Sequence, residues 1–201
     1  MLKAVQEAPT TKQRIVAAAL ETVKEEGFAG TSARSIARRG DFNQALIFYH
    51  FGTLNDLLLA ALDHTSNERM NRYREALAGV SEVPDLIGVA TGLYREDLES
   101  GHITVVSEMI AGSLARPDLA PEVVARMDPW VDFAEEFIRD VLVRMGLDSV
   151  IPARTAAFAV VAMIFGVNLL SHLDEDNSRA EALFEMGSRL AQVLLPAGAQ
   201  P

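Results

Sequence analysis

The residues with the clearest potential for chemistry lie in the stretch RRGDFNQALIFYHFGT, residues 38–53. The amide of Gln44 can pair with adenine through two hydrogen bonds. Close to it are apolar side chains suited to the methyl group of thymine, namely Ala45, Leu46 and Phe48. Tyr49 and His50 follow, and both side chains can donate hydrogen bonds to phosphate oxygens. A helix that turned these groups outward could read the major groove of double-stranded DNA.

The same apolar residues admit a second interpretation, because a short apolar helix can equally be part of a core. Helical spacing places Ile47 and Phe51 on one face, where they can join a core. It leaves Gln44 and Phe48 on the opposite face. The alternative is that Leu46 and Phe48 pack beneath the remainder of the protein, and the pattern alone leaves both interpretations open.

The elements that must position this segment are helices separated by short turns. The first helix is expected over residues 11–26, with Gly27 as its C-cap and Phe28 packing back onto it. Thr31 or Ser32 is expected to cap a second, short helix. The segment in question would then be the third helix of a small N-terminal unit.

The second helix is expected to end at RRGD, because Gly40 and Asp41 both tolerate left-handed backbone geometry. Asn43 is a good N-cap for the third helix, over residues 44–50, and Thr53 caps a long helix after it. A short helix, a tight turn and a second short helix, supported by a preceding helix, make a helix-turn-helix.

Beyond Pro84 the sequence consists of amphipathic segments divided by turn-rich stretches, without the alternating pattern of strands. The expected helical segments are 85–99, 103–115, 121–145, 153–172 and 178–195. We therefore predict an all-α fold, in which an N-terminal three-helix helix-turn-helix head is fused to an all-helical body. The head covers residues 1–52, completed by the start of a helix over 53–77, and the body covers residues 53–201.

Composition limits the chemistry open to this chain. Of its 201 residues 49% are hydrophobic and 23% charged, and the lack of cysteine excludes disulfides and thiolate metal sites. Residues 1–14 lack the apolar segment of a signal peptide, and the longest apolar run, 156–167, is shorter than the ~20 residues that span a bilayer. We expect a soluble cytoplasmic protein with no membrane partner.

Charge is distributed unevenly along the sequence. Residues 1–52 carry seven basic and five acidic side chains, whereas the whole chain has a net charge of −10. A mildly basic head on a strongly acidic body permits DNA binding through the head and disfavours it elsewhere.

An enzyme is the main alternative class, and the sequence offers little that would support one. The four histidines have no metal-ligand spacing, and no glycine-rich phosphate loop or nucleophile elbow occurs. Adjacent carboxylates such as Glu25 and Glu26 point apart on a helix. We expect no catalysis, no metal site and no cofactor.

The stretch TSARSIARRGDFNQALIFYHFGTLNDLLLAAL, residues 31–62, resembles the DNA-binding signature of the TetR family of one-component repressors. That pattern has a Thr/Ser pair opening a helix, an arginine two positions on, Ile-Ala, a turn, a small capping residue and an aromatic–aromatic–His–Phe ending. The resemblance implies a ligand-responsive transcriptional regulator, a repressor, that binds a pseudo-palindromic DNA operator as a homodimer. It also implies that the helical body is a ligand-binding and dimerisation domain, and that a small-molecule effector releases the DNA.

The resemblance assigns DNA-contacting roles to two groups of residues. The positions that bond phosphate, or reach a base from the second helix, are matched by Thr31, Ser32, Arg34, Tyr49, His50 and Thr53. The base-facing positions are matched by Gln44, Ala45, Leu46 and Phe48. Two departures matter: the usual lysine of the fourth helix is Leu54, so one phosphate contact is missing, and the usual turn glycine is Asp41, with Gly40 one place earlier.

The segment ARTAAFAVVAMIFGVNLLSHL, residues 153–173, is apolar nearly all the way round, which indicates a helix buried on both faces. With residues 178–195 it is expected to form a four-helix dimer interface, as the last two helices of TetR-like repressors do. The predicted interface residues are Ala159, Ala162, Gly166, Leu170, Leu183 and Leu190. The alternative is that this helix is the central core helix of a monomer.

The body also carries side chains typical of a binding pocket. The apolar ones are Tyr94, Met109, Trp130, Phe133, Phe137 and Met163, and the polar ones that could orient a ligand are Arg95, Glu108 and Asn168. Each aromatic or methionine on its own is more often core filling. Together they best fit an apolar or amphipathic small molecule. The remaining alternative function is a helical interaction protein whose degenerate head does not bind DNA.

Overall fold

The structure is a computed structural model that describes the whole chain except residues 1–7, 81–82, 115, 117, 175–177 and 195–201. The described residues are mostly helical and contain no strand. The prediction of an all-α fold with a helix-turn-helix head and a helical body is confirmed.

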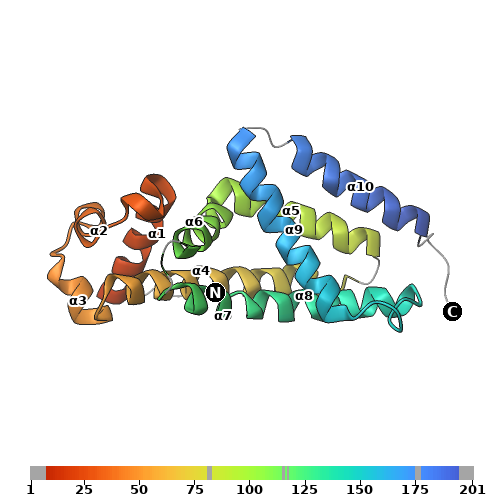
Figure 1. Cartoon of the computed structure of the whole chain (residues 1–201), viewed down its shortest axis with the longest axis horizontal. Helices are drawn as coiled ribbons and strands as arrows, with labels where there is room; N and C mark the ends of the chain where they lie inside the picture. Colours follow the sequence, from red (N-terminus) through yellow and green to blue (C-terminus); the bar gives the residue numbers. More distant parts are fainter. Residues whose placement is uncertain (1–7, 81–82, 115, 117, 175–177, 195–201) are drawn as a thin grey trace, which may run out of the picture.

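The head is formed by α1 (Thr11–Gly30), α2 (Ala33–Gly40) and α3 (Ala45–Phe51). These three helices lie together at one end of the molecule (Figure 1). Their inward side chains meet in one buried cluster, which we call the head core: Ile15, Val16, Ala18, Ala19, Ile36, Ile47, Leu57 and Ala61. The short helices α2 and α3 therefore depend on α1 for their burial.

Hydroxyl side chains define where the head helices begin and end. The Ser32 hydroxyl accepts from the Ser35 backbone N–H, in a capping box that starts α2. Thr31 instead donates its hydroxyl to the Gly27 carbonyl at 2.6 Å, at the end of α1. Of the two candidate caps, Ser32 is thus the one that caps α2.

Helix α4 (Leu54–Leu77) belongs to both parts of the molecule. It begins at Thr53, whose hydroxyl accepts from the Asp56 N–H at 3.0 Å, and runs from the head along the body (Figure 1). Its early residues Leu57 and Ala61 join the head core, while Leu58 and Leu62 join the main core of the body. A tilt of this helix would therefore move the head relative to the body.

The body consists of α5 (Val83–Ser100), α6 (His102–Leu114), α7 (Ala120–Ala125), α8 (Asp128–Arg144), α9 (Ala153–Asp174) and α10 (Ser178–Leu194). The expected single helix over 121–145 is wrong, because the chain breaks between α7 and α8. Pro129 lies in the first turn of α8 and has no N–H to bond the carbonyl of Ala125, so a continuous helix cannot form there.

The junction between α1 and α6 extends the expectation for Phe28, which packs against a cluster that includes Val23 of α1 and also contacts α6. Helix α1 bends at Gly27, whose φ is +69°. Beyond the bend, the ring of Phe28 lies so close to Gly112 of α6 that a Cβ there would come within 2.2 Å of it. The Phe28 N–H also donates to Glu108 Oε2 at 2.8 Å. Phe28 therefore fastens the head to the body.

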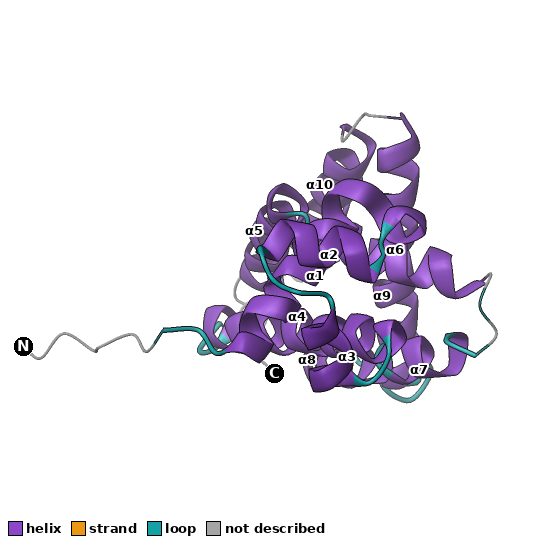
Figure 2. Ribbon diagram, turned by 90° about the vertical axis from the view of Figure 1, so that its left-hand side faces the viewer, coloured by secondary structure: helices purple, strands orange, loops and turns teal. Residues whose placement is uncertain are grey.

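Among the described helices, no single one is long and apolar enough to cross a membrane; only α3 and α4 taken together, with a bend of 69° between them, pass by length and composition. Viewed from the side, every labelled element is a helix and the connections are short (Figure 2).

Candidate DNA interface and effector site

Helix α3 turns one face into the head and the other outward. Ile47 is fully buried and Phe51 packs against the head core, as the helical spacing predicts. On the other face Gln44 and Ala45 are exposed, and Phe48 and Tyr49 are 49% and 81% exposed. The alternative in which Phe48 packs beneath the body is therefore wrong. Leu46 lies between the two faces, half-buried against the head core.

Three residues determine the conformation of the turn before α3, each in a different way. Asp41 adopts the left-handed conformation at φ +51° and ψ +57°, as expected for a residue replacing the usual glycine. Gly40 does not use the left-handed conformation that it tolerates, and is needed for space: a Cβ would lie 2.1 Å from the Phe42 ring. Asn43 accepts from the Ala45 N–H at 2.8 Å. These contacts fix the angle at which α3 leaves α2.

A hollow between α2 and the start of α3 brings predicted and unpredicted residues together. Its lining includes Arg34 and Gln44, which the family resemblance selected, and also Arg38 and Asn43, which it did not. Arg38 lies one helical turn after Arg34, so the spacing of the arginines on α2 was the available signal. Arg38 therefore places a second positive charge, in addition to that of Arg34, beside the outward face of α3.

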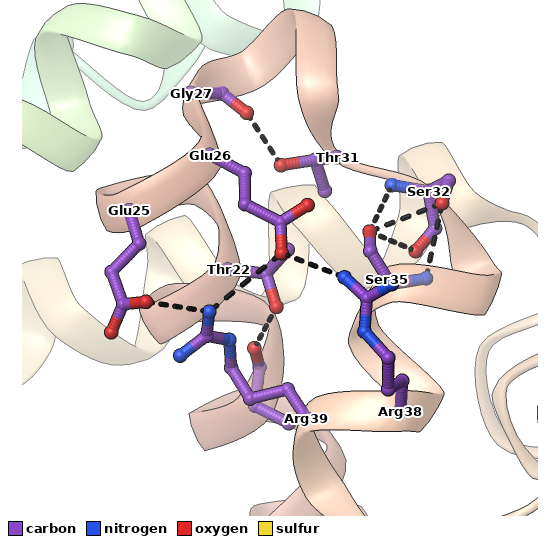
Figure 3. Close-up of polar contacts among 10 residues, drawn as sticks. Thr22, Glu25, Glu26, Gly27, Thr31, Ser32, Ser35, Arg38 and Arg39 are labelled. Atoms are coloured by element: carbon purple, nitrogen blue, oxygen red, sulfur yellow. Dashed lines mark hydrogen bonds and ion pairs between the residues drawn. The ribbon is translucent and has the colours of Figure 1, made fainter.

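Ion pairs anchor α2 against the end of α1 (Figure 3). Arg39 Nη2 lies 2.7 Å from Glu25 Oε2, and its hydrogen bond lowers the pKa of the Glu25 carboxyl. Arg38 Nη2 lies 3.2 Å from Glu26 Oε1. These pairs are exposed, so they contribute little net stability and chiefly orient the two arginines.

The other predicted DNA-contacting residues lie around this surface. Ser32 and Arg34 are exposed at the start of α2, and Thr31 is half-buried just before it. The ring of His50 is half-buried and packs edge-on against Tyr49, with ring centroids 5.0 Å apart. Thr53 is exposed at the start of α4. Their roles toward DNA stay a prediction.

Comparisons with known proteins agree with this arrangement. Residues 15–61 match the sequence model of the family described as "Bacterial regulatory proteins, tetR family". The regulator UidR of Escherichia coli K12 is 23% identical over 183 residues, which is 91% of each chain. The repressor Rv3405c of Mycobacterium tuberculosis is 43% identical over 60 residues, 28% of this chain and 32% of its own length.

A solved structure extends the likeness to the whole fold. The TetR-family protein SCO1917 from Streptomyces coelicolor A3 is 28% identical, with a TM-score of 0.64 over 94% of this chain and 100% of the other. The fold and the outward face of α3 define a DNA-binding transcriptional regulator of the helix-turn-helix class rather than an enzyme. The family match over residues 15–61, the relatives and the solved structure together support a transcriptional regulator of the TetR family.

The predicted ligand residues do not converge on one site. Only Trp130, Phe133 and Phe137 lie together, against Met70, Tyr73 and Leu77. Tyr94 packs on Phe184 of α10 at a ring distance of 4.8 Å, and Met109 is part of the main body core. The others are placed as follows: Arg95 exposed near Glu181, Glu108 bonded to Phe28, Met163 at the surface, and the Asn168 side chain outside the described residues. As a ligand set these residues stay a prediction.

Helix α9 presents an apolar face at the surface of the single chain. Ala159, Ala162, Gly166 and Leu170 are exposed, Leu183 of α10 is half-buried, and the Leu190 side chain lies outside the described residues. Ala157, on the other face, is fully buried. The helix is therefore not buried on both faces within one chain, which contradicts its interpretation as the central core helix of a monomer.

Sequence reasoning missed a group of buried polar side chains inside the body. Arg69 of α4 lies 2.8 Å from Asp97 of α5, and the Tyr73 hydroxyl donates to the same carboxylate. Beside them, Thr65 and His102 Nδ1 are hydrogen-bonded at 2.6 Å. Burial raises the pKa of Asp97 and of Tyr73, and it lowers the pKa of His102 to about 4. The i, i+4, i+8 spacing of Thr65, Arg69 and Tyr73 was the only signal in the sequence.

Proposed function

We propose that this chain is a repressor that binds a pseudo-palindromic operator as a dimer and is released by a small apolar or amphipathic molecule. The observation that carries the proposal is the outward face of α3, where Gln44, Phe48 and Tyr49 are exposed on a helix otherwise anchored in the head core. Gln44 would read adenine and Phe48 a thymine methyl, while Tyr49 and His50 would bond phosphates. Rv3405c, which resembles this chain over 60 residues, is a transcriptional repressor, and this supports repression as the direction of regulation.

The dimer would form through α9 and α10. Leu170 of the predicted strip is exposed in the single chain, and so are three further apolar side chains on these helices: Phe158, Leu169 and Met186. A contiguous exposed apolar face of this kind favours burial against a second copy. Two heads related by a two-fold axis would meet half-sites about 34–36 Å apart, or a multiple of that spacing.

Release would follow from the sharing of α4 between head and body. A ligand that binds better when α4 is tilted favours a dimer whose α3 helices are wrongly spaced for the operator. The ligand then weakens DNA binding by the same factor by which DNA weakens ligand binding.

The proposal is tested by selecting genomic fragments with the full-length protein and measuring gel-shift affinities on the recovered site. Tyr49→Phe and His50→Ala should weaken binding to all sequences, whereas Gln44→Ala should mainly relax the base preference. Asp148→Ala, an exposed substitution in the turn between α8 and α9, is the control. Parent-like affinity for all three head variants, or binding insensitive to salt, would instead favour a head that does not read DNA.

The dimer is tested separately. Ala162→Glu places a charge in the exposed strip of α9, so it should yield a monomer by light scattering and lose operator binding while keeping its helical content. A dimer that survives this substitution would show that the chains associate through another surface.

A further inference from the structure

Two buried hydrogen-bonding groups in the body have no partner among the described residues. They are the Ser66 hydroxyl on α4 and the Trp130 indole N–H on α8. Ser66 is only 4% exposed, and the indole nitrogen is itself buried. A buried donor without an acceptor costs about 1–3 kcal/mol, and native proteins seldom retain one without a water or a ligand to satisfy it.

The two groups belong to the same part of the interior. Ser66, Met70 and Tyr73 follow one another on one face of α4 at the spacing of successive helical turns. Trp130 packs with Met70 in one apolar cluster, and its ring meets the Tyr73 ring edge-on at 5.8 Å. The ring of His102 lies 6.2 Å from the same indole. The unpartnered donors thus lie on α4 and α8, where the aromatic side chains of the two helices pack together.

The buried charges in this region cancel, and a further cation, Arg74, is exposed and lies over the Phe133 ring, 5.4 Å from the ring centroid. Both carboxylate oxygens of Asp97 are occupied, one by Arg69 and the other by the Tyr73 hydroxyl. His102 is neutral near pH 7, because burial lowers its pKa to about 4. A cationic ligand would be repelled by Arg69 and an anionic ligand by Asp97. Neither would find a free opposite charge to offset the cost of its desolvation.

We propose that the effector is a neutral, planar aromatic molecule with a hydrogen-bond acceptor such as a carbonyl oxygen, bound between α4 and α8. Its acceptor atom accepts hydrogen bonds from the Trp130 N–H and the Ser66 hydroxyl, and its ring packs against Tyr73 and Phe133. Because Tyr73 and Trp130 already touch, the ligand must part α8 from α4, the helix that carries the head. The inference rests on the proposed function and names the chemical class of its effector.

The indole of Trp130 provides a direct test, because it is the only tryptophan of the chain and gives a single indole N–H signal in a ¹H–¹⁵N spectrum. The DNA-free full-length protein is titrated with acetophenone, and separately with ethylbenzene, benzoate and benzylammonium. We expect acetophenone to move the indole proton downfield in a saturable way. Ethylbenzene lacks the acceptor and the other two carry charge, so each should bind at least about tenfold more weakly. Equal shifts with all four compounds, or none with acetophenone, would overturn the proposal.

Substitutions locate the binding site. Ser66→Ala removes one donor and should weaken acetophenone about tenfold, measured on the same signal. Trp130→Phe keeps an aromatic ring without the N–H and should weaken it similarly by calorimetry. The control is Ser113→Ala, the same change at a buried serine whose hydroxyl already donates to the Ile110 carbonyl. Acetophenone binding unaffected by both site variants would refute the assignment.

These outcomes are separable from those of the operator experiment. If no compound binds while the protein still shifts the selected DNA, only the effector class fails. If acetophenone binds at Trp130 while no DNA is shifted, the regulator proposal fails and the binding site stands.

Discussion

The head and the body of this molecule handle polar groups in opposite ways. Among the described residues of the head no charge is buried, and the buried hydroxyls of Thr22 and Ser35 donate to the backbone of their own helix or its cap. In the body, Asp97 is 1% exposed and is held by Arg69 and Tyr73. Helix α4 passes through both regions; its buried residues are apolar in the head, whereas in the body they include polar side chains as well.

The two regions therefore differ in the free-energy cost of the polar groups that they bury. The head needs only a fixed scaffold for an outward face, and a small apolar core supplies it with little desolvation cost. The body accepts the cost of burying charge, and a buried pair contributes little net stability over an apolar replacement. We relate these buried polar groups to the binding of an effector, which is the role that we propose for the adjoining part of α4 and α8.

The largest effect that can separate scaffold from surface is expected in the head core. Ile36→Ala removes a fully buried side chain and should destabilise the head by about 4 kcal/mol, measured by denaturant unfolding. Phe48→Ala, at a half-exposed outward position, should change stability by less than about 1 kcal/mol but reduce operator binding. If Phe48→Ala destabilises the head as much as Ile36→Ala does, Phe48 is part of the scaffold and not of the binding surface.

The buried histidine of the body predicts an acid-sensitive stability. The ordinary pKa of 6.5 for His102 falls to about 4 in the folded protein because of burial. The unfolded chain therefore takes up a proton below pH 6.5 that the folded chain refuses until about pH 4. Stability should be full above that window and fall by about 3 kcal/mol as the pH drops through it.

His102→Asn, which keeps a hydrogen-bonding group near the position of Nδ1, should remove this loss between pH 6.5 and pH 4. His64→Asn serves as the control, because His64 is exposed on α4. Thermal unfolding at a series of pH values decides the matter. An unchanged slope in the His102 variant would mean that another group of the body causes the loss.

The same contrast explains what the sequence could and could not predict. The outward face of α3 followed from periodicity, since Ile47 and Phe51 had to join a core and Gln44 and Phe48 lie opposite them. The break before α8 was missed, although Pro129 was a signal for it in the sequence. The family pattern located the head because its residues are close together in the sequence.

The polar interior of the body could not be predicted in this way. The pair of Arg69 and Asp97 joins two successive helices, α4 and α5, and either residue alone looks like an ordinary surface charge. The destination of Phe28 was equally hidden, since an aromatic after a helix end can pack on its own helix or on any neighbour. Predicting these contacts requires the tertiary arrangement and not the local pattern.

A glycine substitution should sharpen the account of the turn. Gly40→Ala forces a methyl group against the ring of Phe42 and the Cβ of Ala18, so we expect a loss of about 2 kcal/mol in the free energy of unfolding. Gly88→Ala on α5 meets nothing within 4 Å and should stabilise the protein by up to about 1 kcal/mol. Similar losses in both variants would show that space near Phe42 is not the constraint at Gly40.

The smallest effect on stability is expected at Arg38, where a change in binding should appear without a change in folding. Arg38→Gln breaks an exposed pair with Glu26, so stability should change by less than about 0.5 kcal/mol. If Arg38 contacts phosphate from the hollow beside α3, the variant should bind every DNA sequence more weakly, with a salt slope shallower by about one. Arg189→Gln removes a comparable exposed pair with Glu185 on α10 and should leave DNA binding unchanged. A parent-like salt slope in Arg38→Gln would mean that Arg38 only orients α2 on α1, and that the charged surface of the head ends at Arg34.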